Sequence, residues 1–148
     1  MDIRKLIRNY TIASYKIDGV YAKFSKRLGF NESDLCLFYA LYPDNKLSQK
    51  QICNEWQIPK TTLNTALKKY QKIDYLEFIS MPNNHKELLV CLSEKGRTNI
   101  KYYIETLYKA EERAMRQVLE LYDEKFIEAT NIFANLIEKE FKNIIGNL

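Results

Sequence analysis

Residues 48–70 read SQKQICNEWQIPKTTLNTALKKY, and they carry the clearest local signals of secondary structure in the chain. Ser48 and Gln51 form a capping-box pattern, in which the serine oxygen accepts a hydrogen bond from the backbone three residues later and the glutamine returns one. The pattern predicts a short helix over 49–56. Pro59 suits the start of a second helix, where its missing N–H costs nothing, and this helix is expected to run to about residue 73. Two short helices joined by a tight turn indicate a helix-turn-helix.

The hydrophobic periodicity changes after Asp74. Residues 75–81 and 87–92 predict two strands, and residues 82–85 between them predict a turn. A hairpin directly after a helix-turn-helix is typical of a winged helix. We therefore predict that residues 31–92 form a winged helix-turn-helix that binds DNA.

Helices are expected on both sides of this part. Residues 1–28 place apolar side chains at spacings of three and four and end at Gly29. A helix after Asn31 should turn Leu35, Leu37, Phe38 and Leu41 inward. Ser93 and Glu94 predict the start of a long helix to about residue 121. A final helix from Asp123 should turn these side chains inward: Phe126, Ile127, Ile132, Phe133, Leu136, Ile137, Phe141 and Ile144.

The whole reads as one domain over 1–148, mainly α with a small β-hairpin wing. A chain this small has more amphipathic helix than one monomeric core can cover, so residues 1–28 and 94–148 are expected to form a helical dimerisation part. We expect Ile3, Leu6, Ile7, Tyr10, Phe126, Ile127, Phe133 and Ile137 to contribute to it. The alternative is that these helices pack on their own domain.

The composition excludes several classes of protein. No apolar stretch approaches the roughly 20 residues of a membrane helix, and the first residues lack a signal peptide, so a cytoplasmic location is expected. Cys36, Cys53 and Cys91 are too widely spaced for a metal knuckle, and His85 is the one histidine. Neither a phosphate-binding glycine loop nor a catalytic triad pattern appears. We therefore expect no metal, no cofactor and no enzymatic activity.

The charge is concentrated where DNA would bind. The net charge is +4, of which residues 46–104 carry +5, residues 1–45 carry +2 and residues 105–148 carry −3. A basic middle third favours a polyanionic partner.

On these motifs the sequence resembles the MarR family of bacterial regulators. Residues 48–52 are similar to the first helix of that family's helix-turn-helix, and residues 59–67 are similar to its recognition helix. Residues 88–96 are similar to the segment that follows its wing. The resemblance covers nearly the whole chain. It implies a homodimeric winged-helix regulator, a repressor that reads a pseudo-palindromic operator and is released by a small aromatic or lipophilic effector.

The sequence departs from the family's pattern by lacking arginine between Arg27 and Arg97. The family often has arginine where Thr65 and Phe78 stand, and an aspartate-x-arginine pair where residues 84–86 stand. Arginine is the usual partner of guanine, whereas asparagine pairs with adenine and threonine methyls contact thymine. We therefore predict an A·T-rich operator, contacted by Ser48, Gln49, Lys60, Thr61, Thr62, Asn64, Thr65, Lys68, Asn84, His85 and Lys86.

The sequence leaves three questions open: where an effector binds, whether a cysteine senses oxidants, and whether the partner is DNA or protein. The effector is expected to lie among Tyr10, Cys36, Tyr39, Tyr102 and Tyr103, but such residues are also ordinary core and boundary residues. A cysteine could instead sense oxidants, although buried cysteines are usually inert. Finally, a winged helix could bind protein rather than DNA, as an interaction module or anti-regulator.

Overall fold

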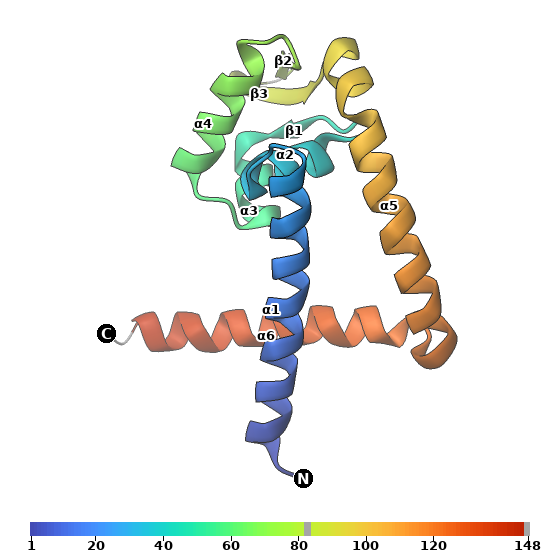
Figure 1. Cartoon of the computed structure of the whole chain (residues 1–148). Helices are drawn as coiled ribbons and strands as arrows, with labels where there is room; N and C mark the ends of the chain where they lie inside the picture. The colour runs from blue at the N-terminus through green and yellow to red at the C-terminus, as the bar shows by residue number, and fades with distance from the viewer. Residues whose placement is uncertain (82–83, 147–148) are drawn as a thin grey trace. The chain divides into compact units, whose positions relative to one another are not determined.

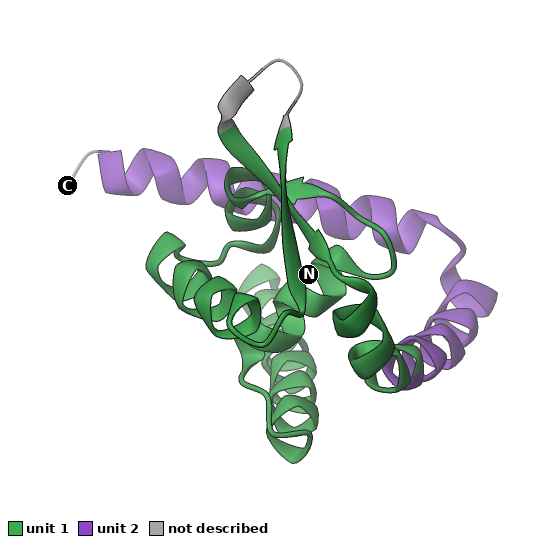
Figure 2. Cartoon of the chain, turned by 90° about the horizontal axis from the view of Figure 1, so that it is seen from above, with its two compact units in different colours: residues 1–105 green, residues 106–148 purple. Residues whose placement is uncertain are grey.

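The computed structural model describes residues 1–81 and 84–146, apart from the side chains of residues 81 and 84–86. The chain divides into two compact units, Met1–Glu105 and Thr106–Leu148 (Figure 2). The described residues form mainly helices and one three-stranded sheet, which confirms the predicted fold class. None of the described helices is both long and apolar enough to cross a membrane.

Apart from the additional strand β1, the elements follow one another in the predicted order, and each label is that of Figure 1. The first unit contains α1 (Ile3–Arg27), α2 (Glu32–Leu41), β1 (Leu47–Ser48), α3 (Gln49–Trp56), α4 (Lys60–Gln71), β2 (Leu76–Met81), β3 (Asn84–Leu92) and the beginning of α5 (Glu94–Tyr122). The second unit contains the rest of α5 and α6 (Lys125–Gly146).

Local sequence signals place the helix ends. Asn31 and Asp34 form a capping box at the start of α2, and Ser48 and Gln51 form the predicted one at the start of α3. Gly29 follows α1 with a φ of +77°, a backbone conformation that favours glycine. The α1 helix runs through Gly19 without interruption.

The sheet has the strand order β1-β3-β2, and both pairings are antiparallel. The sequence missed β1, because two residues are too few to show a strand period. Leu47 of β1 pairs with Val90, which places the beginning of α3 beside the wing. The return strand begins at Asn84 rather than at residue 87, so the predicted turn over 82–85 is too long. Cross-strand pairing with Met81 extends the strand toward the tip.

The core of the first unit lies where α2, α3, α4 and the sheet meet. The side chains predicted to turn inward from α2 are all buried, and Phe38 packs edge to face on Tyr70 of α4 at 4.5 Å between ring centres. Ile52 of α3 and Leu63 of α4 are fully buried in the same core. Apolar contact thus fixes which face of each short helix points inward.

The predicted inward face of α6 is not buried within the chain, so this prediction is wrong. Seven of its eight apolar residues are 39–55% exposed, and Phe133 is half-buried. The physical reason is that the second unit holds only α6 and the C-terminal part of α5, which is too little structure to form a core of its own.

Candidate nucleic-acid interface

The α4 helix presents a polar, basic face to solvent because its apolar face is committed to the core. Leu63, Ala66, Leu67 and Tyr70 are buried, at the spacing of three and four residues that defines one side of a helix. The exposed residues of the helix include Lys60, Thr61, Thr62, Thr65, Lys68 and Lys69. The α4 sequence contains no acidic residue, so nothing on the helix opposes a phosphate backbone.

The turn between α3 and α4 is tight. Gln57 ends α3 in the left-handed conformation with a φ of 51°, and Ile58 is buried. Pro59 is the N-cap, so α4 begins at Lys60, one residue later than predicted. Because proline offers no side-chain acceptor, the first-turn N–H groups of α4 have no side-chain cap. They carry the positive end of the helix dipole toward solvent, where it favours an anion.

Thr61 and Thr65, which are predicted to contact bases, lie one turn apart on the exposed face of α4. The Thr65 hydroxyl donates a hydrogen bond to the Thr61 carbonyl at 3.1 Å, which fixes the side chain and leaves its methyl group available for apolar contact. Asn64 is half-buried at the edge of the exposed face. Thr65 and Asn64 therefore both border the DNA-binding surface that the sequence predicted.

Ser48 and Gln49 occupy different environments at the start of α3. Ser48 is buried, and its Oγ accepts a hydrogen bond from the Gln51 backbone at 3.2 Å while Gln51 Oε1 accepts one from the Ser48 backbone at 2.8 Å. The Ser48 hydroxyl therefore serves to begin the helix. Gln49 is half-buried and faces the groove described next.

A groove of about 500 Å³ joins α3, the start of α4 and the wing. It brings together Gln49 and Lys60, which the sequence singled out separately. Its lining also includes Lys50, an exposed cation that the sequence reasoning missed although it follows Gln49 in a solvent-facing position. The full lining is Gln49, Lys50, Cys53, Asn54, Lys60, Glu87 and Leu88.

The wing is built from β2 and β3. The side chains of Asn84, His85 and Lys86, predicted to contact DNA, lie outside the described residues. Phe78, at the position where the family often has arginine, is half-buried and pairs across the sheet with Val90. The described part of the wing therefore uses this position for packing.

The residues that follow β3 hold the base of the wing against the turn between α4 and β2. The Ser93 hydroxyl donates to the Asp74 carbonyl at 2.6 Å and accepts from the Gly96 backbone at 2.9 Å. Gly96 packs directly on the Tyr75 backbone, where a Cβ would collide with it. The glycine of the Leu92–Gly96 motif is thus required by a close approach of two backbone segments.

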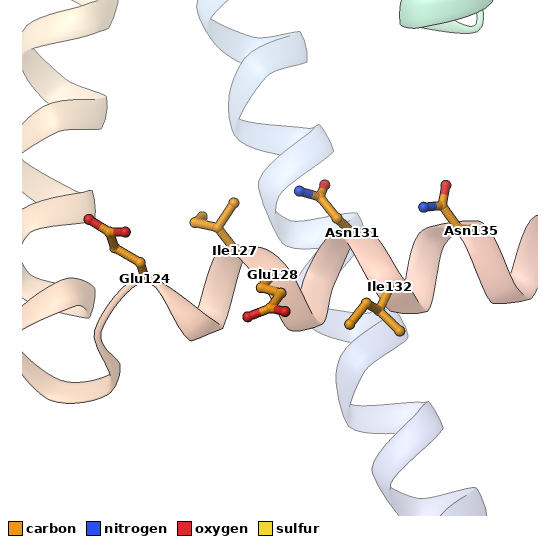
Figure 3. Close-up of a pocket in the computed structure, with 6 residues that line it drawn as sticks. All are labelled: Glu124, Ile127, Glu128, Asn131, Ile132 and Asn135. Atoms are coloured by element: carbon orange, nitrogen blue, oxygen red, sulfur yellow. The ribbon is translucent and has the colours of Figure 1, made fainter.

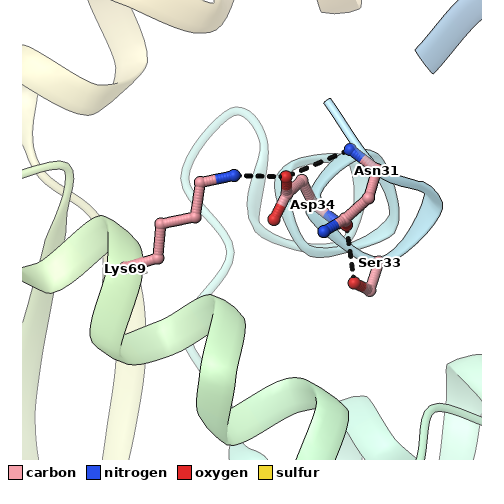
Figure 4. A network of polar contacts seen from close by, with 4 residues as sticks. All are labelled: Asn31, Ser33, Asp34 and Lys69. Carbon is pink, nitrogen blue, oxygen red and sulfur yellow. Dashed lines mark hydrogen bonds and ion pairs between the residues drawn. The ribbon is translucent and has the colours of Figure 1, made fainter. Parts of the chain in front are cut away.

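A partly buried ion pair, which the sequence reasoning missed, joins α2 and α4 (Figure 4). Lys69 Nζ lies 2.6 Å from Asp34 Oδ2, and the Asn31 backbone N–H donates to the same oxygen at 3.1 Å. Desolvation lowers the pKa of Lys69, but the hydrogen bonds and charge of its neighbours outweigh it and raise the pKa overall. Lys69 therefore remains charged at neutral pH.

The predicted dimerisation residues lie on exposed faces. Ile3, Leu6, Ile7 and Tyr10 of α1 are 45–61% exposed. On α6, Ile127 contributes to a hollow that is lined by residues of this helix and by Glu124, which precedes it (Figure 3). The hollow is lined by Glu124, Ile127, Glu128, Asn131, Ile132 and Asn135.

The ring contacts of the predicted effector residues divide between two clusters. Tyr39 packs on Trp56 of α3 at 5.4 Å between ring centres, whereas Tyr103 packs on Phe30 at 5.6 Å and on Tyr102 at 5.7 Å. Tyr10 is exposed on α1.

Two of the three cysteines lie in surroundings that disfavour the thiolate. Burial raises the pKa of the Cys36 thiol from 9.0 to about 11. Burial, with a smaller contribution from the Glu77 charge, also raises the pKa of Cys91. Because the thiolate is the reactive form, these surroundings disfavour reaction of both residues at neutral pH.

No protein-family model matches the sequence, and no curated protein matches it. Solved structures match over almost the whole chain. A MarR family regulator from Neisseria meningitidis has a TM-score of 0.72 and 19% identity, covering 97% of this chain and 99% of that one. The transcriptional regulator BldR from Sulfolobus solfataricus has a TM-score of 0.69 and 16% identity, covering 91% and 98%.

A third similar structure is that of a MarR family transcriptional regulator from Listeria monocytogenes complexed with a 26mer DNA. Its TM-score is 0.60 at 20% identity, and the match covers 93% of this chain and 87% of that one. These likenesses extend over the helix-turn-helix, the wing and the flanking helices. The chain therefore has the winged helix-turn-helix fold of the MarR family.

Proposed function

We propose that the protein is a sequence-specific DNA-binding transcriptional regulator that inserts α4 into the major groove. The observation that carries this proposal is the exposed face of α4, which offers lysines, threonines and first-turn N–H groups and no acidic residue. A helix of this kind, preceded by a short helix and followed by a hairpin, suits major-groove docking. The similar structure from Listeria monocytogenes, which is complexed with DNA, supports the same partner.

The operator is expected to be A·T-rich. Asn64 can donate to and accept from an adenine edge, and the methyl groups of Thr61 and Thr65 can contact thymine methyls. Lys60 and Lys68 are exposed near these residues and would bind phosphates. In the wing, His85 and Lys86 are proposed to approach a narrow A·T-rich minor groove, together with Asn84.

We infer that the protein acts as a homodimer and represses transcription from a pseudo-palindromic site. The exposed apolar side chains of α1 and α6 support a partner helix surface, because single chains rarely leave such long apolar stripes in water. Two copies related by a two-fold axis would present two recognition helices to successive half-sites. A dimer bound across a promoter would block transcription by occupying the site.

Release by a small aromatic or lipophilic effector is part of the same proposal. Its support is the half-buried position of Cys36, Tyr39 and Tyr103, which leaves part of each side chain accessible. An effector would have to bind the DNA-competent arrangement more weakly than the alternative. Addition of salicylate as an aromatic probe should then weaken DNA binding, and unchanged affinity across a panel of aromatic acids would count against this part.

Selection of binding sites from a random duplex library tests the central proposal. The protein should enrich A·T-rich half-sites, and its affinity should fall steeply with salt because phosphate contacts release counterions. Lys68→Glu should weaken binding to every duplex, while Lys139→Glu, an exposed position of α6 with the same charge change, should not. G·C-rich half-sites would overturn the predicted composition. If no duplex binds in a salt-dependent way, the DNA-binding proposal fails and a protein-interaction module becomes the better account.

A further inference from the structure

The α2 helix carries the one buried acidic side chain among the described residues. The Asp34 side chain is 1% exposed, whereas the Lys69 side chain that it binds is 48% exposed. Its Oδ1 has no hydrogen-bond partner among the described residues, whereas Oδ2 accepts from both Lys69 Nζ and the Asn31 backbone N–H. Burying a charge is costly unless it is paired, and therefore the position of the Lys69 ammonium is strongly constrained.

We propose that Asp34 is a positioning residue for DNA recognition, an inference that rests on the proposed function. By holding Lys69, it fixes the rotation of α4 about its own axis and withholds the Lys69 charge from DNA. Asp34 contacts α4 near the C-terminal end of this helix, at Lys69, one residue beyond the predicted phosphate contact at Lys68.

The apolar contacts of α4 fix which face of the helix points inward, but they leave room for small rotations about its axis. Leu63, Ala66 and Leu67 pack against the core, but apolar burial is non-directional and tolerates small rotations. A charge-assisted hydrogen bond of 2.6 Å is directional. The ring of Tyr70, whose centre lies 4.8 Å from Lys69 Nζ, adds a second contact to the same ammonium group.

Base readout is sensitive to such a rotation. Side-chain ends lie about 5 Å from a helix axis, so a rotation of about 20° moves them by about 2 Å. That displacement exceeds the tolerance of a hydrogen bond to a base edge. Surface lysines whose ammonium groups are not held by a buried carboxylate, such as Lys68, can follow the same movement and keep their phosphate contacts. Loss of the ion pair should therefore reduce sequence specificity more than overall affinity for DNA.

The competing explanation is that Lys69 is itself a phosphate contact which Asp34 partly neutralises. Consecutive residues leave a helix about 100° apart, so Lys68 and Lys69 face different directions. The two explanations predict opposite effects of Asp34→Asn, which removes the partner but keeps the Lys69 charge. A released phosphate contact would tighten binding to every sequence, whereas a misplaced helix would lose its preference for the selected one.

The experiment compares wild type, Asp34→Asn and Lys68→Gln on two probes, a duplex selected from a random library by wild type and a mixed-sequence duplex. For Asp34→Asn, the affinity for the selected duplex divided by that for the mixed-sequence duplex should fall about tenfold, which corresponds to the loss of one base contact. The salt slope should not decrease. For Lys68→Gln, both affinities should fall alike and the salt slope should decrease by about one. A ratio for Asp34→Asn within twofold of wild type, or equal tightening on both probes, would overturn the inference.

A second pair of variants separates positioning from folding. Asp34→Asn combined with Lys69→Met keeps the net charge and removes the ion pair, and the new amide oxygen can still accept from the Asn31 backbone N–H. It should fold, as judged by circular dichroism, and should show the same reduced ratio. Lys69→Arg keeps the pair and should retain the wild-type ratio. If wild type binds neither probe, the proposed function fails together with the inference; if wild type binds and both pair-breaking variants keep the ratio, the inference alone fails.

Discussion

Gly96 packs so closely on Tyr75 that no side chain fits between them. A Cβ built on Gly96 would lie 2.9 Å from both the carbonyl carbon and the Cα of Tyr75, and closer still to its carbonyl oxygen. Both neighbours are backbone, so neither can move aside as a flexible side chain would. This contact holds the beginning of α5 against the end of the α4–β2 turn.

Gly96→Ala should therefore destabilise the protein, although alanine is the better helix former. Overpacking against backbone costs about 1–3 kcal/mol of unfolding free energy. Gly19→Ala in α1 is the matched control, because nothing lies within 4 Å of its Cβ position, and it should stabilise by about 0.5–1 kcal/mol. Urea unfolding measures both variants, and a stabilised Gly96→Ala would show that the two segments are not held together.

Ser93→Ala should lower the unfolding free energy by about 1–2 kcal/mol, as loss of an N-cap does. The variant loses both the bond to the Asp74 carbonyl and the acceptor for the Gly96 backbone. Thr98→Ala, an exposed position in the same helix, is the control and should change stability by less than about 0.5 kcal/mol. Equal effects of the two substitutions in thermal or urea unfolding would contradict the assigned role of Ser93.

Asn64→Ala and Lys68→Ala should affect DNA binding in different ways. Loss of a bidentate base contact at Asn64 should cost about 1–3 kcal/mol on the selected site and relax the preference at one base position. Loss of Lys68 should weaken binding to all sequences and reduce the salt slope by about one. Gln71→Ala, exposed on the same helix, provides the control. An unaltered base preference for Asn64→Ala in a repeated site selection would remove Asn64 from the reading surface.

Ile7→Glu should convert a dimer to monomers. Ile7 is 48% exposed on the apolar side of α1, and a carboxylate buried there without a partner would be strongly unfavourable. Asn9→Glu adds the same charge two residues later, on nearly the opposite side of the helix, and should leave the dimer intact. Sedimentation equilibrium distinguishes the outcomes. A wild-type monomer at micromolar concentration would exclude the dimer outright.

Cys36 should react slowly with iodoacetamide below pH 9. A rise of its pKa from 9.0 to about 11 reduces the thiolate fraction about a hundredfold. Because the pKa of Cys36 is higher in the folded than in the unfolded state, its contribution to the free energy of unfolding is complete below pH 9.0 and is lost as the pH rises toward about 11. Mass spectrometry of the Cys36 peptide, with the urea-unfolded chain as reference, gives the rate. Labelling of the folded protein at the unfolded rate at pH 8 would instead favour thiol sensing.

Much of the fold was predictable because its helix ends are local. The capping box of Ser48 and Gln51 gave the α3 bounds that the structure has, and Gly29 gave the end of α1. The inward face of α2 followed from its spacing of apolar residues. Pro59 misled by one residue, because it caps α4 from outside instead of occupying the first turn.

The candidate site was predictable only where one helix carries it. The exposed lysines and threonines of α4 follow from the period of that helix, whereas Lys50 enters the site through a groove that three elements form together. The β1 strand depends in the same way on its partner Val90, which is distant in sequence. Pairing between distant segments leaves little trace in either segment alone.

The order of the helices and of the hairpin, and the polarity of α4, follow from local sequence, because capping, proline geometry and helical period act over a few residues. Three other features arise only when distant segments pack together: the close contact of Gly96 with Tyr75, the third strand and the pairing of Asp34 with Lys69. Asp34 and Lys69 each look like an ordinary surface charge in the sequence. Only the packing of α2 on α4 removes the carboxylate from water, and burial then makes the lysine beside it necessary.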